Sequence, residues 1–196
     1  MLDLKNKSAC LFGLPDSGKS TLANFIVTKY GRAAFVYDTL NEYPESPYDS
    51  YTPKDRNSVP ELEGVVRAIM AGRRYRLLLI DEANRFCPSK PNPLPQAIAD
   101  LNDYRAHYEM STIYIARRPV QLNQDLTELA NYLILFHLDG KNDRQYLNDI
   151  SAGLGDIAAT LKPFHFAVYH KGQGTQVYNP VKAIYTTAKI IKAAIT

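Results

Sequence analysis

Residues 13–20 read GLPDSGKS, which fits the phosphate-binding pattern G-x-x-x-x-G-K-S. Two glycines at this spacing let the backbone curl tightly, so that successive N–H groups point at the oxygens of a polyphosphate. Lys19 can reach the β- and γ-phosphates, and the Ser20 hydroxyl can ligate Mg²⁺. The pattern therefore predicts that ATP is bound by Gly13, Pro15, Asp16, Ser17, Gly18, Lys19, Ser20 and Thr21.

A pair of acids, Asp81 and Glu82, directly follows the apolar run LLLI at residues 77–80. We expect Asp81 to hold the Mg²⁺ shell, because a hard divalent cation favours oxygen ligands. We expect Glu82 to orient or deprotonate an attacking water. Such a carboxylate favours hydrolysis over phosphoryl transfer to an acceptor, since a kinase must exclude water. The alternative is a strand that ends in a solvated acidic turn.

A third candidate, Arg117, follows the apolar run at 112–115. A strand inserted in the sheet beside the one that leads to Gly13 would bring a polar residue at its end close to the γ-phosphate. Arg117 is the residue in that position. The alternative is a basic turn on the surface.

These residues need a scaffold, and short apolar runs alternating with helical patterns predict one with a parallel sheet. We predict strands at 8–12, 33–37, 77–80, 112–115 and 132–136, and helices near 19–30, 61–71, 95–108, 123–130 and 143–150. A hairpin is expected from 164–170 and 175–178, and a terminal amphipathic helix over 180–195. The proline spacing of segments 41–60 and 87–95 excludes a regular helix from both.

The composition is that of a globular protein, with 196 residues, 45% hydrophobic and 22% charged. One domain over residues 1–196 is expected. A net charge of +3 permits a nucleic-acid partner without indicating one. The two cysteines, Cys10 and Cys87, suggest neither a disulfide framework nor a metal cluster, which favours an intracellular protein. No apolar stretch approaches the about 20 residues of a membrane span, so the chain is expected to be soluble.

Several further segments together resemble the FtsK/HerA superfamily of P-loop ATPases. YDTLNEY at 37–43 resembles the element D-x-x-G-E-Y of HerA-type proteins, with Asn41 where glycine is usual. Residues 101–108 and 111–115 resemble the R-x-x-G-h-x-h stretch that leads into the fourth strand, and ARRP at 116–119 stands where the family has T-Q-R-P. Residues 126–138 and the pair Asp143-Arg144 resemble the buried fifth strand and the polar turn after it. The similarity covers roughly residues 8–150.

The resemblance implies an α/β fold of the RecA-like P-loop NTPase type (the ASCE type), with a mostly parallel central sheet flanked by helices and a C-terminal hairpin and helix. Arg105 matches the family position from which an arginine finger reaches a neighbouring subunit's nucleotide; a solvated helix residue is the alternative. Arg117 stands where the family has a glutamine that orients water, and an arginine cannot accept a hydrogen bond. Either Arg117 stabilises phosphate charge directly or the sensing role lies elsewhere.

A compact chain of this superfamily looks most like the genome-packaging ATPases of membrane-containing icosahedral viruses. That likeness implies an ATP- and Mg²⁺-dependent translocase that packages double-stranded DNA into a capsid. It also implies a ring-shaped homo-oligomer (a pentamer or hexamer), located in the host cytoplasm or on the virion, with a capsid vertex or membrane protein as candidate docking partner. A small nucleotide or metabolite kinase, and a DNA-transfer or phage-assembly ATPase, are the alternatives.

Two loops are candidates for holding the DNA backbone in such a ring. One is 87–95 with Lys90, and the other is 117–124 with Arg118, Gln121 and Asn123. The basic cluster Arg73, Arg74 and Arg76 precedes the 77–80 strand, at the sheet edge away from the nucleotide. We interpret that cluster as a solvated face.

Overall fold

A computed structural model describes residues 3–43 and 47–182 of the chain. The terminal helix predicted for 180–195 lies outside the described residues from 183 onward. Within the described ranges, no helix has the length and apolar character needed to cross a bilayer.

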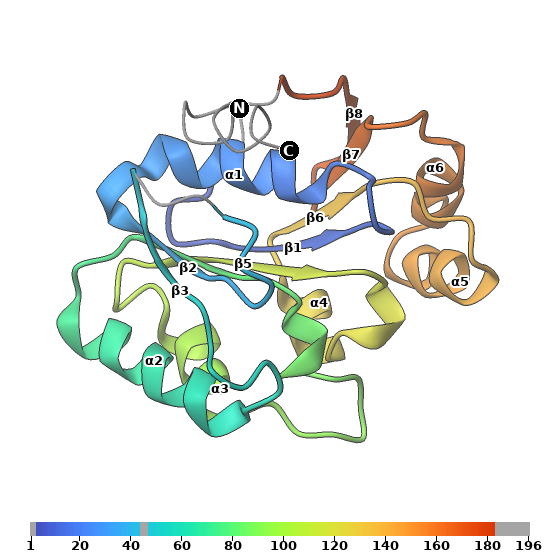
Figure 1. Cartoon of the computed structure of the whole chain (residues 1–196). Helices are drawn as coiled ribbons and strands as arrows, with labels where there is room; N and C mark the ends of the chain where they lie inside the picture. Colours follow the sequence, from blue (N-terminus) through green and yellow to red (C-terminus); the bar gives the residue numbers. More distant parts are fainter. Residues whose placement is uncertain (1–2, 44–46, 183–196) are drawn as a thin grey trace.

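An eight-stranded sheet with the order β3-β2-β4-β5-β1-β6-β7-β8 forms the centre of the molecule (Figure 1). Its strands are β1 (Ser8–Phe12), β2 (Ala34–Tyr37), β3 (Asp49–Tyr51), β4 (Leu77–Ile80), β5 (Ser111–Ala116), β6 (Tyr132–Leu135), β7 (Phe166–His170) and β8 (Gly174–Tyr178). The pairs among the first six strands are parallel, whereas β7 runs antiparallel to β6 and to β8. The predicted α/β class and its C-terminal hairpin are confirmed.

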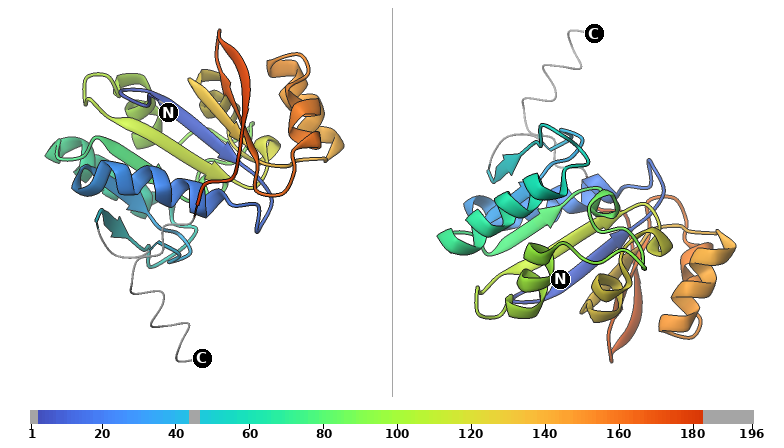
Figure 2. Two further views of the ribbon diagram at one scale, coloured as in Figure 1. Left: turned by 90° about the horizontal axis from the view of Figure 1, so that it is seen from above. Right: turned by 90° about the horizontal axis from the view of Figure 1, so that it is seen from below.

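Helices cover both faces of this sheet (Figures 1 and 2). One face carries α1 (Lys19–Tyr30), and the other carries α2 (Val59–Gly72), α3 (Gln96–Tyr104) and α4 (Gln124–Leu129). Two further helices, α5 (Lys141–Ile150) and α6 (Leu154–Thr160), lie near the β7–β8 hairpin, at the other end of the sheet from β3 (Figure 2).

The alternation of side chains along β1 explains why helices must cover both faces of the sheet. Ala9 and Leu11 belong to the buried cluster that contains α1, whereas Cys10 and Phe12 belong to the cluster under α2, α3 and α4. Successive side chains of a strand point to opposite faces, so a strand buried on both sides reads as a continuous apolar run. The runs at 8–12 and 77–80 were predictable for this reason.

Two elements differ from the sequence prediction because tertiary contacts form them. β3 is a three-residue edge strand inside the proline-containing stretch 41–60, and its Tyr51 carbonyl accepts a hydrogen bond from the Asp38 amide at 2.9 Å. α6 begins after Gly153 and includes Gly155, where a Cβ would collide with the backbone of Arg144 in α5. Glycine lowers the intrinsic preference for helix, and here it permits close packing of two helices.

The helix predicted over 95–108 is shorter than expected, since α3 ends at Tyr104. The chain then turns, with Glu109 at φ 49°, and the Met110 amide donates to the Arg105 carbonyl at 3.0 Å. Arg105 therefore lies at the end of α3 and not inside a helix.

The strand order has one consequence for function. β5 lies between β1 and β4, as expected for a strand inserted beside the one that leads to Gly13. Because β1, β4 and β5 are parallel, their carboxyl ends share one edge of the sheet. Residues 13–20, the Asp81–Glu82 pair and Arg117 follow these three strands directly.

Candidate active site

The loop between β1 and α1 needs its two glycines for different reasons. A Cβ on Gly13 would lie 2.6 Å from Ser17 Oγ and 2.7 Å from Phe136 Cβ, so the space admits no side chain. Gly18 has φ +103°, a conformation that costs other residues free energy. The loop therefore packs closely against Phe136 at Gly13, and its backbone turns sharply at Gly18.

The first turn of α1 has the properties of an anion-binding site. Gly18 caps the helix without a side-chain hydrogen bond, and the first turn contains no acidic residue. Free amides and the positive end of the helix dipole therefore face the cleft. Lys19 folds back over the loop, where its Nζ donates to the Leu14 carbonyl at 2.7 Å. Burial lowers the pKa of Lys19, although the nearby carboxylates of Glu82 and Asp81 oppose that shift.

Several carboxylates lie close together across the cleft from this loop. Asp81 is only 5% exposed, and burial raises its pKa to about 7, with contributions from the negative charges of Glu82, Glu42 and Asp38. Ser20 Oγ donates to Glu42 Oε2 at 3.2 Å. The hydroxyl and the carboxylates thus place several hard oxygen atoms at one end of the cleft, a donor set suited to Mg²⁺.

Glu42 is held in this position by the loop after β2. The Asp38 carboxylate accepts hydrogen bonds from the amides of Glu42 and Tyr43, both at 2.9 Å, and Thr39 Oγ1 donates to the Asp81 carbonyl at 2.7 Å. Asn41 has φ 59°. Asparagine tolerates this left-handed conformation better than most residues, which explains how it can replace the glycine usual in the D-x-x-G-E-Y element.

Arg117 contacts the second acid of the pair. Its Nε donates to Glu82 Oε1 at 3.1 Å, and Arg85 Nε lies 3.8 Å from Glu82 Oε2. Glu82 itself has φ 49° and is nearly buried. Its carboxylate is therefore fixed between two guanidinium groups at the edge of the cleft.

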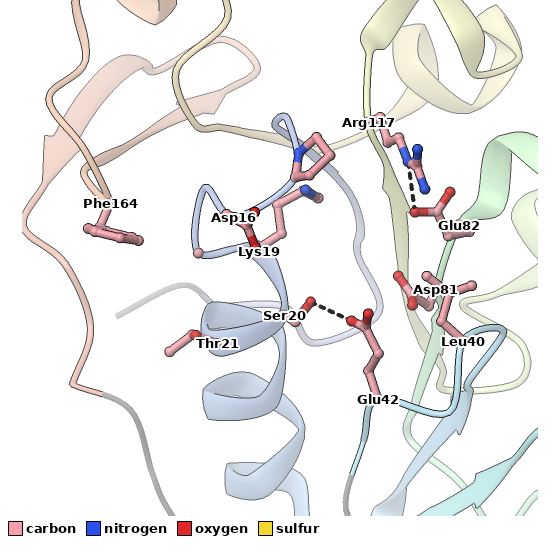
Figure 3. A pocket seen from close by; sticks show the side chains of 12 residues that line it. Asp16, Lys19, Ser20, Thr21, Leu40, Glu42, Asp81, Glu82, Arg117 and Phe164 are labelled. Atoms are coloured by element: carbon pink, nitrogen blue, oxygen red, sulfur yellow. Dashed lines mark hydrogen bonds and ion pairs between the residues drawn. The ribbon is translucent and has the colours of Figure 1, made fainter.

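Most of these groups line one cleft of about 480 Å³ (Figure 3). It is lined by Pro15, Asp16, Gly18, Lys19, Ser20, Thr21, Leu40, Glu42, Asp81, Glu82, Arg117 and Phe164. Of the loop residues predicted from the sequence, Gly13 and Ser17 do not line the cleft. The predicted phosphate and metal ligands are thus brought together, although their roles remain predictions.

Arg105 is the predicted residue that lies elsewhere. Its Nη1 donates to the Asn102 carbonyl at 2.6 Å, and its Nη2 donates to Asn131 Oδ1 at 3.4 Å. Asn131 precedes β6, and its amide donates to the Ser8 carbonyl at the start of β1. Arg105 is therefore at the opposite edge of the sheet from the cleft of its own chain.

Three residues of the cleft were not predicted as site residues, namely Leu40, Glu42 and Phe164. Leu40 and Glu42 belong to the D-x-x-G-E-Y-like segment, so the resemblance contained a signal for them. The sequence pattern predicts only the start of a hairpin at Phe164. Its sequence neighbourhood contains no motif that would have identified it.

The two loops proposed for DNA contact pack against each other. Asn123 is fully buried, and its Nδ2 donates to the carbonyls of Pro88 and Asn92 at 3.2 and 2.9 Å. The prediction that Asn123 contacts DNA is therefore wrong, because its amide joins the two loops. Arg118 Nε donates to the buried Asp143 carboxylate at 2.7 Å, whereas Lys90 pairs with Asp125 at the surface.

The fold has similar solved structures. The genome packaging NTPase B204 from Sulfolobus turreted icosahedral virus 2, in complex with ATP-γS, is 20% identical with a TM-score of 0.76, covering 90% of this chain and 98% of that chain. The DNA-packaging ATPase B204 from Sulfolobus turreted icosahedral virus is 16% identical with a TM-score of 0.77, covering 91% of this chain and 100% of that chain.

A further similar structure is the N-terminal domain of zonular occludens toxin from Neisseria meningitidis. It is 12% identical with a TM-score of 0.56, covering 91% of this chain and 96% of that chain. No protein-family model matches the chain, and no curated protein matches its sequence. The structural likenesses confirm the P-loop ATPase fold that the sequence predicts.

Proposed function

We propose that this chain hydrolyses ATP and couples hydrolysis to the movement of double-stranded DNA during the packaging of a viral genome. The observation that carries the proposal is the convergence of the phosphate loop with Asp81 and Glu82 in one cleft. The fold shared with a genome packaging NTPase and a DNA-packaging ATPase supports this class of motor.

The cleft has groups for a nucleotide and for a magnesium ion. Ser20 and Asp81, with Glu42 beside them, would hold Mg²⁺, which when bound neutralises charge on the phosphates. The raised pKa of Asp81 fits such a site, because crowded carboxylates favour a cation among them. Lys19 exchanges its contact with the Leu14 carbonyl for the phosphates.

Hydrolysis requires a group that acts on water, and Glu82 has that role. Its carboxylate is fixed by Arg117 and Arg85 at the edge of the cleft, so the oriented base exists before the nucleotide arrives. Arg117 stabilises negative charge that develops on the γ-phosphate, as a permanent cation can do without accepting a hydrogen bond. Arg117 thus replaces a glutamine sensor by electrostatics.

The motor is a ring of identical subunits with ATP at the subunit interfaces. Arg105 is the residue proposed to act on the neighbouring subunit's nucleotide, and its distance from its own cleft is consistent with action in trans. Lys90 and Gln121 are exposed on the paired loops 87–95 and 117–124, at the same sheet edge as the cleft, and these loops contact DNA. Such a motor works in the host cytoplasm or on the virion, docked to a capsid vertex or a membrane protein.

The proposal is tested by ATPase assays with and without double-stranded DNA. Lys19→Ala is expected to lose ATP binding. Glu82→Gln is expected to retain ATP binding and to lose hydrolysis by about 100-fold or more. Lys141→Ala and Glu128→Gln are matched controls, since both side chains are exposed and outside the cleft. DNA should increase the ATPase rate of the unmodified protein.

Two outcomes would contradict the proposal. If Glu82→Gln hydrolyses ATP at the parental rate, the water-activating role is wrong. If ATP is consumed only when a small acceptor is added, and DNA has no effect, the chain is a kinase. Sizing the protein with an ATP analogue and duplex DNA tests the ring, because a monomer under those conditions excludes a site shared between subunits.

A further inference from the structure

Phe164 is a large apolar side chain exposed at the cleft. It is 55% exposed, although it is one of the residues that line the cleft. Burying a phenylalanine is favourable, so leaving this ring in water forgoes a stabilising contact. An exposed aromatic ring beside a phosphate-binding loop therefore needs an explanation.

The backbone at Phe164 is also in an unfavourable conformation. The His165 amide donates to the Lys162 carbonyl at 3.0 Å, which closes a turn with Pro163 second and Phe164 third. Phe164 has φ +62°, and glycine is the residue preferred at a third turn position with positive φ. A bulky residue that is both strained and exposed is typical of a functional position.

The ring is nevertheless held in a defined place. A Cβ built on Gly18 would lie 3.4 Å from Phe164 Cδ1 and 3.3 Å from Phe136 Cε1, so both rings approach the end of the phosphate loop. Phe166, two residues further along in β7, packs on Phe136 with ring centroids 5.7 Å apart. The turn is thus anchored through Phe166, and the Phe164 ring approaches Gly18, while more than half of its side chain stays exposed.

The two ends of the cleft differ in chemistry. Figure 3 shows Asp81, Glu82 and Arg117 on one side of the phosphate loop and Phe164 on the other, with Thr21 below it. A triphosphate bound with its γ-phosphate towards Glu82 would extend past Ser20 and Lys19. Its ribose and base would then lie at the end of the cleft where Phe164 is located.

We infer that Phe164 is a stacking surface for the nucleobase, an inference that rests on the proposed nucleotide-binding function. An aromatic ring stacks on the face of any base, because every base has a π surface. Phe164 therefore contributes affinity for nucleoside triphosphates as a class and does not distinguish adenine from guanine.

The test compares ligands with and without a base. Equilibrium binding of ATP, GTP and inorganic tripolyphosphate, each with Mg²⁺, is measured for the parent, Phe164→Ala and Phe164→Tyr. Phe164→Ala should weaken ATP and GTP binding by about fivefold or more and to a similar extent. Tripolyphosphate binding should be unchanged, and Phe164→Tyr should bind all three ligands like the parent. Val177→Ala is the control, since Val177 is a similarly exposed apolar side chain (53%) in β8 and does not line the cleft.

A second measurement uses the absence of tryptophan from the sequence. Phe164→Trp introduces the single indole of the chain, and its fluorescence should be quenched by ATP and GTP and unaffected by tripolyphosphate. Phe164→Gly should melt at an equal or higher temperature than the parent, because glycine adopts positive φ freely, and yet bind ATP more weakly. Opposite effects on stability and binding separate a ligand contact from a packing role.

The inference and the proposed function fail in different ways. If Phe164→Ala binds ATP and tripolyphosphate as the parent does, the stacking role is wrong while the phosphate site stands. If Phe164→Ala weakens both ligands equally and Phe164→Gly melts lower than the parent, the ring only supports the loop, and the inference is again overturned. If the parent binds none of the three ligands, the proposed function itself is wrong.

Discussion

Replacing Asp81 by asparagine is predicted to stabilise the protein and to abolish its Mg²⁺-dependent hydrolysis. In the folded protein burial raises the pKa of Asp81 to about 7 from the ordinary value of 3.8. Between these two values the folded state binds more protons than the unfolded state, so stability falls as the pH rises from about 4 to about 7. A difference of about three pKa units corresponds to a loss of about 4 kcal/mol, which is fully present above pH 7.

Asp81→Asn should remove this loss of folding stability, because an amide has a similar shape to a carboxylate and does not ionise. Without Mg²⁺ or nucleotide, the variant should therefore be more stable than the parent at pH 8, by up to about 4 kcal/mol. The gain should fall to less than half at pH 5. In thermal unfolding, a gain of that size in a chain of this length corresponds to about 10 °C.

Urea unfolding at pH 5 and pH 8 in the presence of a chelator measures both values. Glu128→Gln, which neutralises an exposed carboxylate, is the control and should change stability little at either pH. An Asp81→Asn protein that is no more stable than the parent at pH 8 would falsify the reasoning. So would a gain of equal size at both pH values, since the effect must follow ionisation. The same variant should lose Mg²⁺-dependent hydrolysis.

Three further perturbations follow from the contacts of the cleft and its surroundings. Gly13→Ala should lower the free energy of unfolding by about 1–3 kcal/mol, as measured by urea unfolding, because its Cβ would lie 2.6 Å from a loop hydroxyl. Arg117→Ala removes the cation that contacts Glu82, and should lower kcat by about tenfold or more with little change in ATP affinity; an unchanged kcat would exclude Arg117 from catalysis. Arg118→Ala leaves the buried Asp143 carboxylate without its partner and should destabilise the fold by about 2 kcal/mol or more, which thermal unfolding would detect.

The sequence was most informative where local pattern and burial coincide. The strands β1 and β4 are buried along their whole length because both faces are covered, and each is followed by residues whose chemistry suits phosphate and magnesium. Since parallel strands direct their carboxyl ends to one edge, local patterns were sufficient to predict that residues 13–20 and the Asp81–Glu82 pair meet.

Residues placed by side-chain contacts from distant segments could not be predicted in this way. Glu42 reaches Ser20 because the Asp38 carboxylate shapes the loop between them, and no periodicity encodes that loop. Phe164 reaches the cleft through a turn with an unusual backbone conformation. Asn123 was misread for the same reason, since a polar residue in a basic loop gives no sign that its amide is buried between two loops.

Side chains at the two ends of the cleft are expected to affect different kinetic parameters. In the proposed function Glu82 and Arg117 act where charge changes during hydrolysis, so their removal should lower kcat more than it affects ATP binding. Phe164 contacts a part of the ligand that is unchanged in the reaction, and uniform binding of that kind alters KM and leaves kcat nearly constant. A Phe164→Ala protein that loses kcat at saturating ATP would place the ring in the chemical step or in a conformational step coupled to it. Whether kcat or KM changes therefore tells whether a side chain acts at the end of the cleft where hydrolysis is proposed or at the end near Phe164.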